Sequence, residues 1–309
     1  MGGAAAVAAS AIISRYAMAG SGAAANKPNS NFNGVQIGAI TYSWRSMPGT
    51  AEDLLKYAVQ CGISSVELMG EPAEQFAGVP AGGGRRRQMT AEQKKAQKQT
   101  QQDQLDWRLS VSMDKYRALR KMYNDAGVNI HIVKFGNIGN AGMTDGEIDY
   151  YFNAAKALGA TGITRELSEE AAQRLGPIAD KHKIMIGFHN HTKITPTTYD
   201  GSMLSYGKYL GINFDVGHYV AGTNASPILL IQKHHDRILS LHLKDRKVNN
   251  GANLPFGQGD TPVALILQLV KREGWKFPCD IELEYRIPEG SDAVAEVTKC
   301  VEFCKEALA

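Results

Sequence analysis

The ends of five predicted strands carry side chains of the kinds that bind metal ions or transfer protons. Any one of them would pass as an ordinary structural residue, but five in succession at equivalent positions indicate a shared site. Polar side chains that converge in this way are typical of a catalytic centre. The five segments are Arg165-Glu166, His189-Asn190-His191, Asp215-Val216-Gly217-His218, His242-Leu243-Lys244-Asp245 and Glu282-Leu283-Glu284.

Strand geometry groups several of these side chains. Side chains two residues apart point the same way, so His189 and His191 share a face, as do Glu282 and Glu284. Carboxylates inside an apolar barrel are costly unless a cation neutralises them. A mixed oxygen and nitrogen donor set without thiolate favours one divalent metal ion, Mn²⁺ or Zn²⁺, with Co²⁺ or Fe²⁺ as further options. The alternative is a buried network of ion pairs without a metal.

The elements that position these residues form a repeating pattern. From Val35 onward, eight short apolar segments alternate with helix-length segments. This βα repeat predicts a parallel sheet, and closing eight strands gives a single-domain (β/α)8 TIM barrel, whose reactive groups lie at the C-terminal strand ends. An open doubly wound sheet is the alternative, but no GxGxxG follows the first strand, which argues against its nucleotide-binding form. The predicted strands are Val35–Tyr42, Ser65–Met69, Asn129–Phe135, Gly162–Glu166, Ile184–His189, Gly211–Asp215, Ile238–Leu243 and Cys279–Glu284.

Composition and length agree with one globular domain. The chain has 309 residues, 43% of them hydrophobic, and a formal net charge of +3. The apolar fraction excludes wholesale disorder, and the nearly balanced charge gives no argument for a nucleic-acid partner. We divide the chain into a leader and linker (1–30) and a barrel domain (31–309), with a solvated insertion at about 78–106. The arginines 85–87 in the insertion either hold a phosphate or an acidic partner or are simply solvated.

The N-terminal segment differs in composition from the rest. Met1–Ala25 consists mostly of Ala, Gly, Ser and Ile, and its apolar run Ala4–Ile13 is too short to span a bilayer. The run matches the core of an export signal. We therefore predict a truncated twin-arginine or secretory leader, hence a periplasmic or otherwise exported protein without a membrane span. If the segment is instead an Ala-rich helix or tail, the protein is cytoplasmic.

Motifs in the last three predicted strands resemble those of the xylose isomerase-like TIM barrels, the superfamily of sugar phosphate isomerases and epimerases and of endonuclease IV. The motifs are Asn213-Phe214-Asp215-Val216-Gly217-His218, Ser240-Leu241-His242-Leu243-Lys244-Asp245 and Pro278-Cys279-Asp280-Ile281-Glu282. The resemblance covers roughly residues 35–308. In that family a mid-barrel carboxylate and an Asp, a His and a Glu from strands six, seven and eight hold a divalent metal. The resemblance therefore implies Asp215, His242 and Glu282 as ligands.

The fourth metal ligand has two candidates. The family commonly has Glu at the end of strand five, where this chain has His189. Either Glu166, one strand earlier, supplies the carboxylate, or His189 itself binds. We favour Glu166, because neutral imidazoles are then free for proton transfer. Substrate binding is assigned to His189, Lys244 and Trp44, the last of which is expected to stack on a sugar.

Proton transfer needs a base close to the metal. A metal that polarises a sugar carbonyl lowers the barrier to removing the neighbouring C–H proton. His191 and His218 are the expected bases, since His titrates near the operating pH. Glu284 and Lys134 are further candidates for acid, base or hydroxyl binding, or else they form ordinary ion pairs.

The sequence thus predicts a metal-dependent isomerase or epimerase that acts next to the carbonyl of a small carbohydrate, a sugar or an oxidised sugar. The alternative is a lyase or deglycosidase that eliminates the aglycone from 3-keto-glycosides, which export would favour. A non-catalytic sugar-binding barrel and an abasic-site nuclease are less favoured. The nuclease would need extra His ligands on strands two and three, and Ser65–Met69 carries none. The sugar and the oligomeric state are left open.

Overall fold

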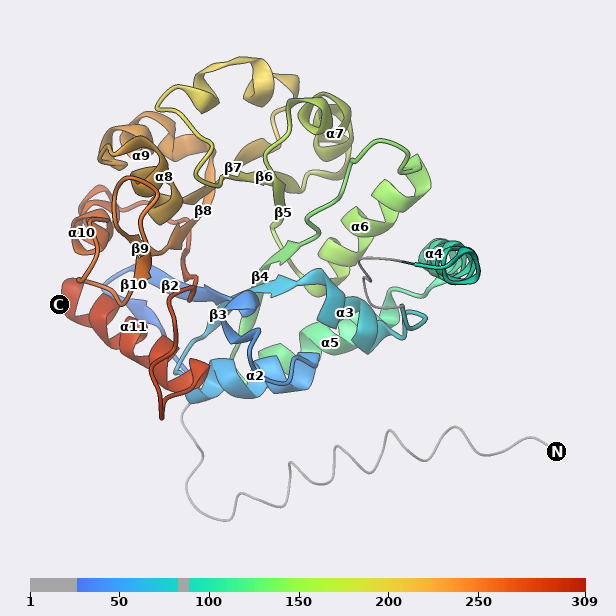
Figure 1. Cartoon of the computed structure of the whole chain (residues 1–309), viewed down its shortest axis with the longest axis horizontal. Helices are drawn as coiled ribbons and strands as arrows, with labels where there is room; N and C mark the ends of the chain where they lie inside the picture. The colour runs from blue at the N-terminus through green and yellow to red at the C-terminus, as the bar shows by residue number, and fades with distance from the viewer. Residues whose placement is uncertain (1–26, 83–88) are drawn as a thin grey trace, which may run out of the picture.

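The predicted TIM barrel is confirmed. The structure, a computed structural model, describes residues 27–82 and 89–309. Eight parallel strands close into a barrel surrounded by helices (Figure 1). Each strand pairs with the next along the chain, and the last, β11, closes the barrel against the first, β2. The barrel strands are β2 (Val35–Ile40), β3 (Ser65–Met69), β4 (Asn129–Lys134), β5 (Gly162–Glu166), β6 (Met185–His189), β7 (Leu210–Asp215), β8 (Ile238–Leu243) and β11 (Cys279–Ile281).

Helices cover the outside of the barrel. Three of the α-helices, α2, α4 and α6, begin at capping boxes in which Thr50 pairs with Asp53, Thr90 with Gln93 and Thr144 with Glu147, so their first N–H groups are satisfied locally. Short strands β1 (Asn31–Phe32), β9 (Asp245–Arg246) and β10 (Asn253–Leu254) lie outside the barrel. The α-helices are α2 (Ala51–Gln60), α3 (Gly70–Ala77), α4 (Ala91–Ser110), α5 (Asp114–Asp125), α6 (Asp145–Leu158), α7 (Glu169–His182), α8 (Val216–Thr223), α9 (Ile228–His234), α10 (Val263–Glu273) and α11 (Ala293–Ala307).

The strands that close the barrel, β2 and β11, are shorter than the sequence predicts. β11 ends at Ile281, so Glu282 lies in the segment that follows the strand. The hydroxyl of Ser43, in the turn after β2, donates to the carbonyl of Ile281 at 3.1 Å and accepts from the N–H of Leu283 at 3.0 Å. This bridge holds the irregular backbone that carries Glu282 in a fixed place.

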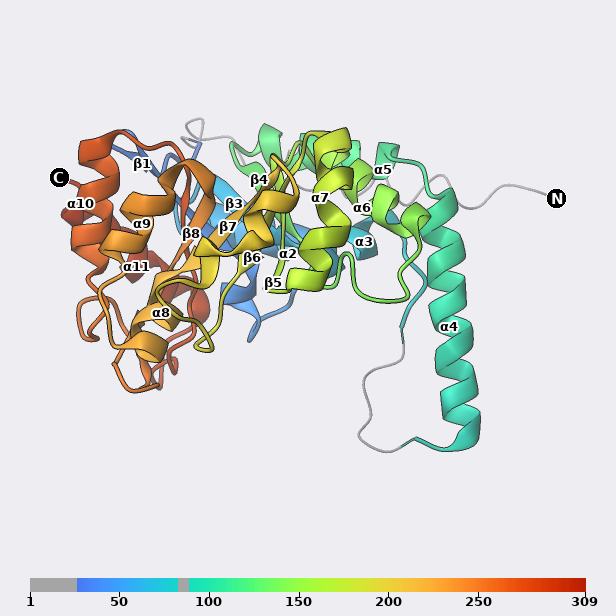
Figure 2. The same cartoon turned by 90° about the horizontal axis from the view of Figure 1, so that it is seen from above.

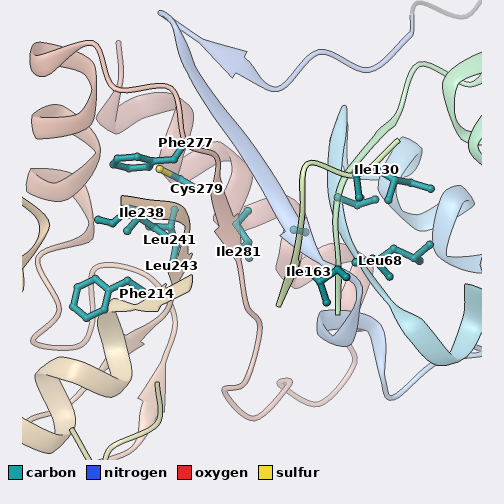
Figure 3. Packing of buried hydrophobic residues seen from close by; sticks show 14 of the residues in the cluster. Leu68, Ile130, Ile163, Phe214, Ile238, Leu241, Leu243, Phe277, Cys279 and Ile281 are labelled. Atoms are coloured by element: carbon teal, nitrogen blue, oxygen red, sulfur yellow. The ribbon is translucent and has the colours of Figure 1, made fainter. Parts of the chain in front are cut away.

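The apolar core lies between the barrel and its helices. Phe214, Leu241 and Leu243 are fully buried in this layer (Figure 3). Ser240 and His242 alternate with the leucines and therefore face the inside of the barrel. TIM-barrel interiors are usually filled by branched apolar side chains. Here the lining is largely polar, so the inward side chains depend on each other for hydrogen bonds.

Two β-bulges change which side chains face inward. The pairing of β3 with β4 skips His131, and the pairing of β7 with β8 skips Leu239. A bulge inserts one extra residue and re-aims the side chains around it. His131 consequently reaches the barrel interior, where it lies 2.8 Å from the hydroxyl of Ser65 and 2.9 Å from a carboxylate oxygen of Asp280.

The insertion after β3 contains a long exposed helix. Helix α4 projects from the barrel (Figure 2), and in the part of the chain that the structure describes none of its residues is buried. It runs four residues past the predicted end of the insertion, from Ala91 to Ser110. Its barrel-proximal end is anchored by Arg108, which donates two hydrogen bonds to the carboxylate of Glu74, at 2.8 and 3.1 Å.

Two sequence predictions fall outside the described residues. The predicted leader, up to residue 26, and the arginines 85–87 are not covered, so the predictions made for them stay predictions. Across 27–82 and 89–309, no helix is long and apolar enough to cross a membrane.

Candidate metal centre

Four side chains from neighbouring strands meet at the C-terminal ends of the barrel strands. His189, Asp215, His242 and Glu282 each offer one ligand atom, and these atoms lie within 4.8 Å of one another. All four residues are buried. They come from β6, β7, β8 and the segment that follows β11. Two imidazoles and two carboxylates at this spacing form a donor set that suits one divalent transition-metal ion.

Asp215 has two roles at the junction of β7 and α8. Its Oδ1 caps the helix by accepting from the N–H of His218 at 2.6 Å. The side chain of Asn190 clamps its backbone, with Nδ2 donating to the carbonyl and Oδ1 accepting from the N–H, both at 3.0 Å. The buried Oδ2 receives no directed hydrogen bond from the described residues, although Nζ of Lys244 lies 2.9 Å away. Buried polar atoms normally have hydrogen-bond partners, and an oxygen whose only close partner among the described residues is a cation fits a metal ligand.

The converging group contains His189, the second of the two candidates, and not Glu166, the favoured one. The carboxylate of Glu166 lies 2.7 Å from Nε2 of His191 and 3.1 Å from Nζ of Lys134. Burial opposes its charge, but these two contacts outweigh it and lower the pKa of Glu166 to about 2. Glu166 is therefore already engaged at the end of β5, where it contacts His191 instead of Asp215, His242 or Glu282.

The surroundings of His189 favour its neutral form, which is the form that binds a metal. Burial lowers its pKa well below the ordinary value, and the charges of Lys134 and His242 add to this effect. Its Nδ1 lies 2.7 Å from Oδ1 of Asn213, an oxygen that only accepts. Nδ1 therefore carries the proton, which leaves the Nε2 lone pair available to a metal.

Glu67 is a buried carboxylate that the sequence reasoning missed. It is fully buried inside the barrel on β3, with Oε2 2.8 Å from Nε2 of His242. Nδ1 of His242 lies 2.9 Å from Glu282. Burial disfavours the charged imidazole, but the two carboxylates outweigh it and raise the pKa of His242 to about 10. The available signal was a lone Glu in the middle of the otherwise apolar strand Ser65–Met69.

His191 lies beside the four side chains and is open to solvent. Its ring centroid lies 5.0 Å from that of His189, and 61% of its side chain is exposed. Glu166 accepts from Nε2 at 2.7 Å and thereby raises the pKa of His191. With Nε2 protonated and engaged, Nδ1 is the nitrogen that can accept a proton from a substrate.

His218, the other predicted base, is enclosed. Its side chain is 10% exposed. Its Nδ1 lies 2.8 Å from Nη1 of Arg246 and its Nε2 lies 3.0 Å from Nζ of Lys244. Burial lowers its pKa. Between two cations, His218 is less suited to collect a proton than His191.

Lys244 lies within the centre and not on a sugar-facing surface. It is 1% exposed. Its Nζ lies 2.9 Å from Asp215, 3.1 Å from Glu282 and 2.7 Å from Glu284. Glu284 and Lys134, expected as acid–base groups or ion pairs, both form ion pairs, with Lys244 and with Glu166 at 3.1 Å.

Trp44 corrects another expectation. Its indole is fully buried in the core, with a ring centroid 6.2 Å from that of Tyr57 in α2. A buried ring offers no face to a sugar, so the predicted stacking role is wrong. In the same turn, Tyr42 is 38% exposed, with the guanidinium of Arg45 over its ring at 4.5 Å.

The chain belongs to the family of xylose isomerase-like TIM barrels. The family model matches residues 55–305, which include all four converging side chains. The resemblance inferred from the motifs of the last three strands is therefore confirmed. A comparison with curated proteins finds no match.

Solved structures share the fold at low sequence identity. The probable 3-DHS dehydratase AsbF of Bacillus anthracis, involved in petrobactin synthesis, is 14% identical, with a TM-score of 0.60 over 87% of this chain and 98% of that one. A sugar phosphate isomerase/epimerase of Parabacteroides distasonis is 18% identical, with a TM-score of 0.56 over 87% and 93% of the two chains. An L-ribulose 3-epimerase is 12% identical, with a TM-score of 0.59 over 89% and 94%. At these identities the likeness shows the fold.

Proposed function

We propose that the protein is a metal-dependent isomerase or epimerase that moves a proton next to the carbonyl of a sugar or oxidised sugar. The observation that carries the proposal is the convergence of His189, Asp215, His242 and Glu282 at one end of the barrel, with the open imidazole of His191 beside them. Structures with the same fold include a sugar phosphate isomerase/epimerase and an L-ribulose 3-epimerase, which supports the reaction class.

The four converging side chains are the proposed ligands. Their donor set suits Mn²⁺ or Zn²⁺, with Co²⁺ or Fe²⁺ as further options. When bound, such an ion supplies Lewis acidity to a substrate carbonyl or hydroxyl oxygen, which acidifies the neighbouring C–H.

The protein's own groups handle the proton. Nδ1 of His191 accepts it from the carbon next to the carbonyl, while Glu166, 2.7 Å from Nε2, orients the ring and stabilises its charge. A base held in this way contributes about 10²–10⁴-fold in rate. Return of a proton needs a second group, and we assign that role to Glu284, whose side chain is 22% exposed and lies 2.7 Å from Nζ of Lys244.

The alternative is a lyase, for example a deglycosidase that acts on 3-keto-glycosides. The same proton abstraction then leads to loss of a leaving group from the adjacent carbon. Two observations favour it: the fold is shared with a probable dehydratase, an enzyme that eliminates water, and two cationic donors, Lys244 and Arg246, flank His218 at 3.0 and 2.8 Å. Such cations can stabilise the negative charge that develops on a departing oxygen by hydrogen bonding.

Incubation in D₂O with Mn²⁺ separates the two reactions. The protein is given free ketoses and, separately, 3-keto-glucosides, and the products are followed by NMR and mass spectrometry. An isomerase or epimerase incorporates deuterium next to the carbonyl and forms a new sugar isomer without releasing an aglycone, whereas released aglycone supports the lyase. The matched control is His191→Ala, which should keep its metal and lose deuterium exchange. Metal-loaded protein that exchanges no proton with any of these substrates would contradict both.

We also propose that the protein is exported, because of the leader-like composition of Met1–Ala25. N-terminal analysis of the native protein tests this. A mature chain that begins after the segment supports export, and a chain that retains these residues contradicts it.

A further inference from the structure

We propose that Glu67 is a positioning residue that fixes which nitrogens of the two ligand histidines, His242 and His189, face the metal. The inference rests on the metal centre proposed above, but it concerns the group behind the ligands and not the ligands themselves. Glu67 is fully buried on β3, on the inside of the barrel.

Both carboxylate oxygens of Glu67 are engaged by donors. Oε2 lies 2.8 Å from Nε2 of His242 and 3.3 Å from Nδ2 of Asn213, and Oε1 accepts from the hydroxyl of Thr164 at 2.5 Å. A carboxylate only accepts, so the Nε2 proton of His242 points at Glu67. Nδ1, on the other side of the ring, faces the ligand group and donates its own proton to Glu282 at 2.9 Å. A metal ion bound at Nδ1 would replace that proton, while the Nε2 proton would stay on Glu67.

Asn213 extends the same control to the second histidine. Its Nδ2 donates to Glu67 and, at 2.6 Å, to the hydroxyl of Ser240, which the bulge in β8 helps to place. The amide oxygen is thereby turned towards His189, where it lies 2.7 Å from Nδ1. A flipped amide would set its oxygen against the carboxylate of Glu67. One buried carboxylate therefore orients both imidazoles of the centre.

A second buried carboxylate–imidazole pair, Asp280 with His131, occurs in the same barrel and serves as the matched control. We call it the lower pair, and Glu67 with His242 the upper pair. Asp280 is fully buried and lies 2.9 Å from Nε2 of His131. Nδ1 of His131 lies 2.8 Å from the hydroxyl of Ser65, and His131 belongs to none of the groups of converging ligand atoms found among the described residues. If Glu67 acted only as a buried charge that stabilises the fold, Glu67→Gln and Asp280→Asn would have the same consequences.

A second role for Glu67 is open to the same test. Glu67, His242 and Asp280 also offer ligand atoms that lie within 4.8 Å of one another. As a direct ligand, Glu67 would hold a second ion together with Asp280, and the protein would bind two metal ions. As a positioning residue, it leaves the stoichiometry at one.

The test compares metal binding by the wild type, Glu67→Gln and Asp280→Asn. Affinities for Mn²⁺ and Zn²⁺ come from competition with a chromogenic chelator, and the Co²⁺ absorption spectrum reports ligand geometry. Loss of an outer partner of a metal-bound histidine typically weakens metal affinity about 10–100-fold. We expect that loss and an altered Co²⁺ spectrum for Glu67→Gln, and unchanged affinity and spectrum for Asp280→Asn. Thermal unfolding in EDTA checks that each variant is folded.

The outcomes are distinguishable. If the wild type binds no metal, the proposed function fails. If the wild type binds one ion and Glu67→Gln binds it equally tightly with the same spectrum, only the positioning role is overturned. A drop from two ions to one in both variants would make Glu67 a ligand and would also overturn it. Should Glu67→Gln not fold, Thr164→Val removes another partner of Glu67 and should give a smaller loss of affinity with a spectral shift; no change there contradicts the proposal.

Discussion

The barrel interior contains two carboxylate–histidine pairs that look alike. In each, a fully buried carboxylate lies close to Nε2 of an imidazole: Glu67 and His242 at 2.8 Å, and Asp280 and His131 at 2.9 Å. Both pairs replace the apolar side chains that usually fill such barrels. Taken pair by pair, burial and distance do not distinguish them.

The second ring nitrogen separates the two pairs. Nδ1 of His242 faces Glu282 and the ligand group at 2.9 Å, whereas Nδ1 of His131 faces the hydroxyl of Ser65 at 2.8 Å. The upper pair is therefore open towards the site, and the lower pair is closed by a neutral hydroxyl. We infer that the partner of Nδ1 decides whether such a pair can affect metal binding.

The largest difference between the pairs should come from removing each histidine. His242→Ala deletes a proposed ligand. Metal affinity should therefore fall by more than the loss of a hydrogen-bond partner of a ligand causes, which is about 100-fold at most. His131→Ala leaves Asp280 buried without its partner, which typically costs about 3–5 kcal/mol in unfolding free energy, yet the folded fraction should bind metal normally. Chelator competition and urea unfolding measure the two effects. Equal loss of metal in both variants would remove the distinction.

A smaller effect is expected just outside the ligand group. His191→Ala should keep its metal, because His191 is not one of the four ligands, while turnover falls about 10²–10⁴-fold with loss of the base. Metal content and rate are measured on the same preparation. The control is His182→Ala, which removes another carboxylate-paired histidine, 2.6 Å from Asp149 on the helical shell, and should leave the rate unchanged. A His191→Ala protein that turns over at the wild-type rate would contradict the assignment of His191 as the base.

Crowding the lower pair should affect stability alone. A Cβ added at Gly38 would lie 2.0 Å from Oδ1 of Asp280 and 2.9 Å from the carbonyl of Ser65. Such overpacking typically costs about 1–3 kcal/mol, so Gly38→Ala should lower the urea midpoint without changing metal affinity. Gly49→Ala is the control, since among the described residues nothing lies within 4 Å of the added atom. Weaker metal binding in Gly38→Ala would show that the two pairs are coupled.

The smallest effect should come from the hydroxyl that closes the lower pair. Ser65→Ala removes the hydrogen bond to Nδ1 of His131. One such bond contributes about 1 kcal/mol, which denaturant unfolding resolves. Metal affinity and turnover should match the wild type, and a changed rate would mean that the lower pair takes part in the chemistry.

Much of the fold and most of the centre could be predicted from the sequence. Alternating apolar segments predicted the eight strands, and barrel closure brings their C-terminal ends together whatever the loops do. That rule alone predicts that Asp215, His242 and Glu282 lie close together. It does not choose between Glu166 and His189, because the direction of a side chain at a strand end depends on partners from other strands, here His191 and Lys134.

Other features depend on contacts that no local pattern contains. Glu67 is one charged residue within an apolar strand, and its importance comes from His242 and Asn213, far away in the chain. His131 faces inward because of a bulge, which alternation cannot predict. The burial of Trp44 depends on packing against α2 and could not be read from its place near a strand end.

The most direct test of the central claim is anomalous diffraction from crystals soaked with Mn²⁺ or Zn²⁺. We predict one strong peak at the C-terminal end of the barrel, with His189, Asp215, His242 and Glu282 at coordination distances of about 2.0–2.2 Å, and with Glu166 turned to His191. The absence of a peak among these four side chains, or a peak that Glu166 coordinates in place of His189, would contradict the account.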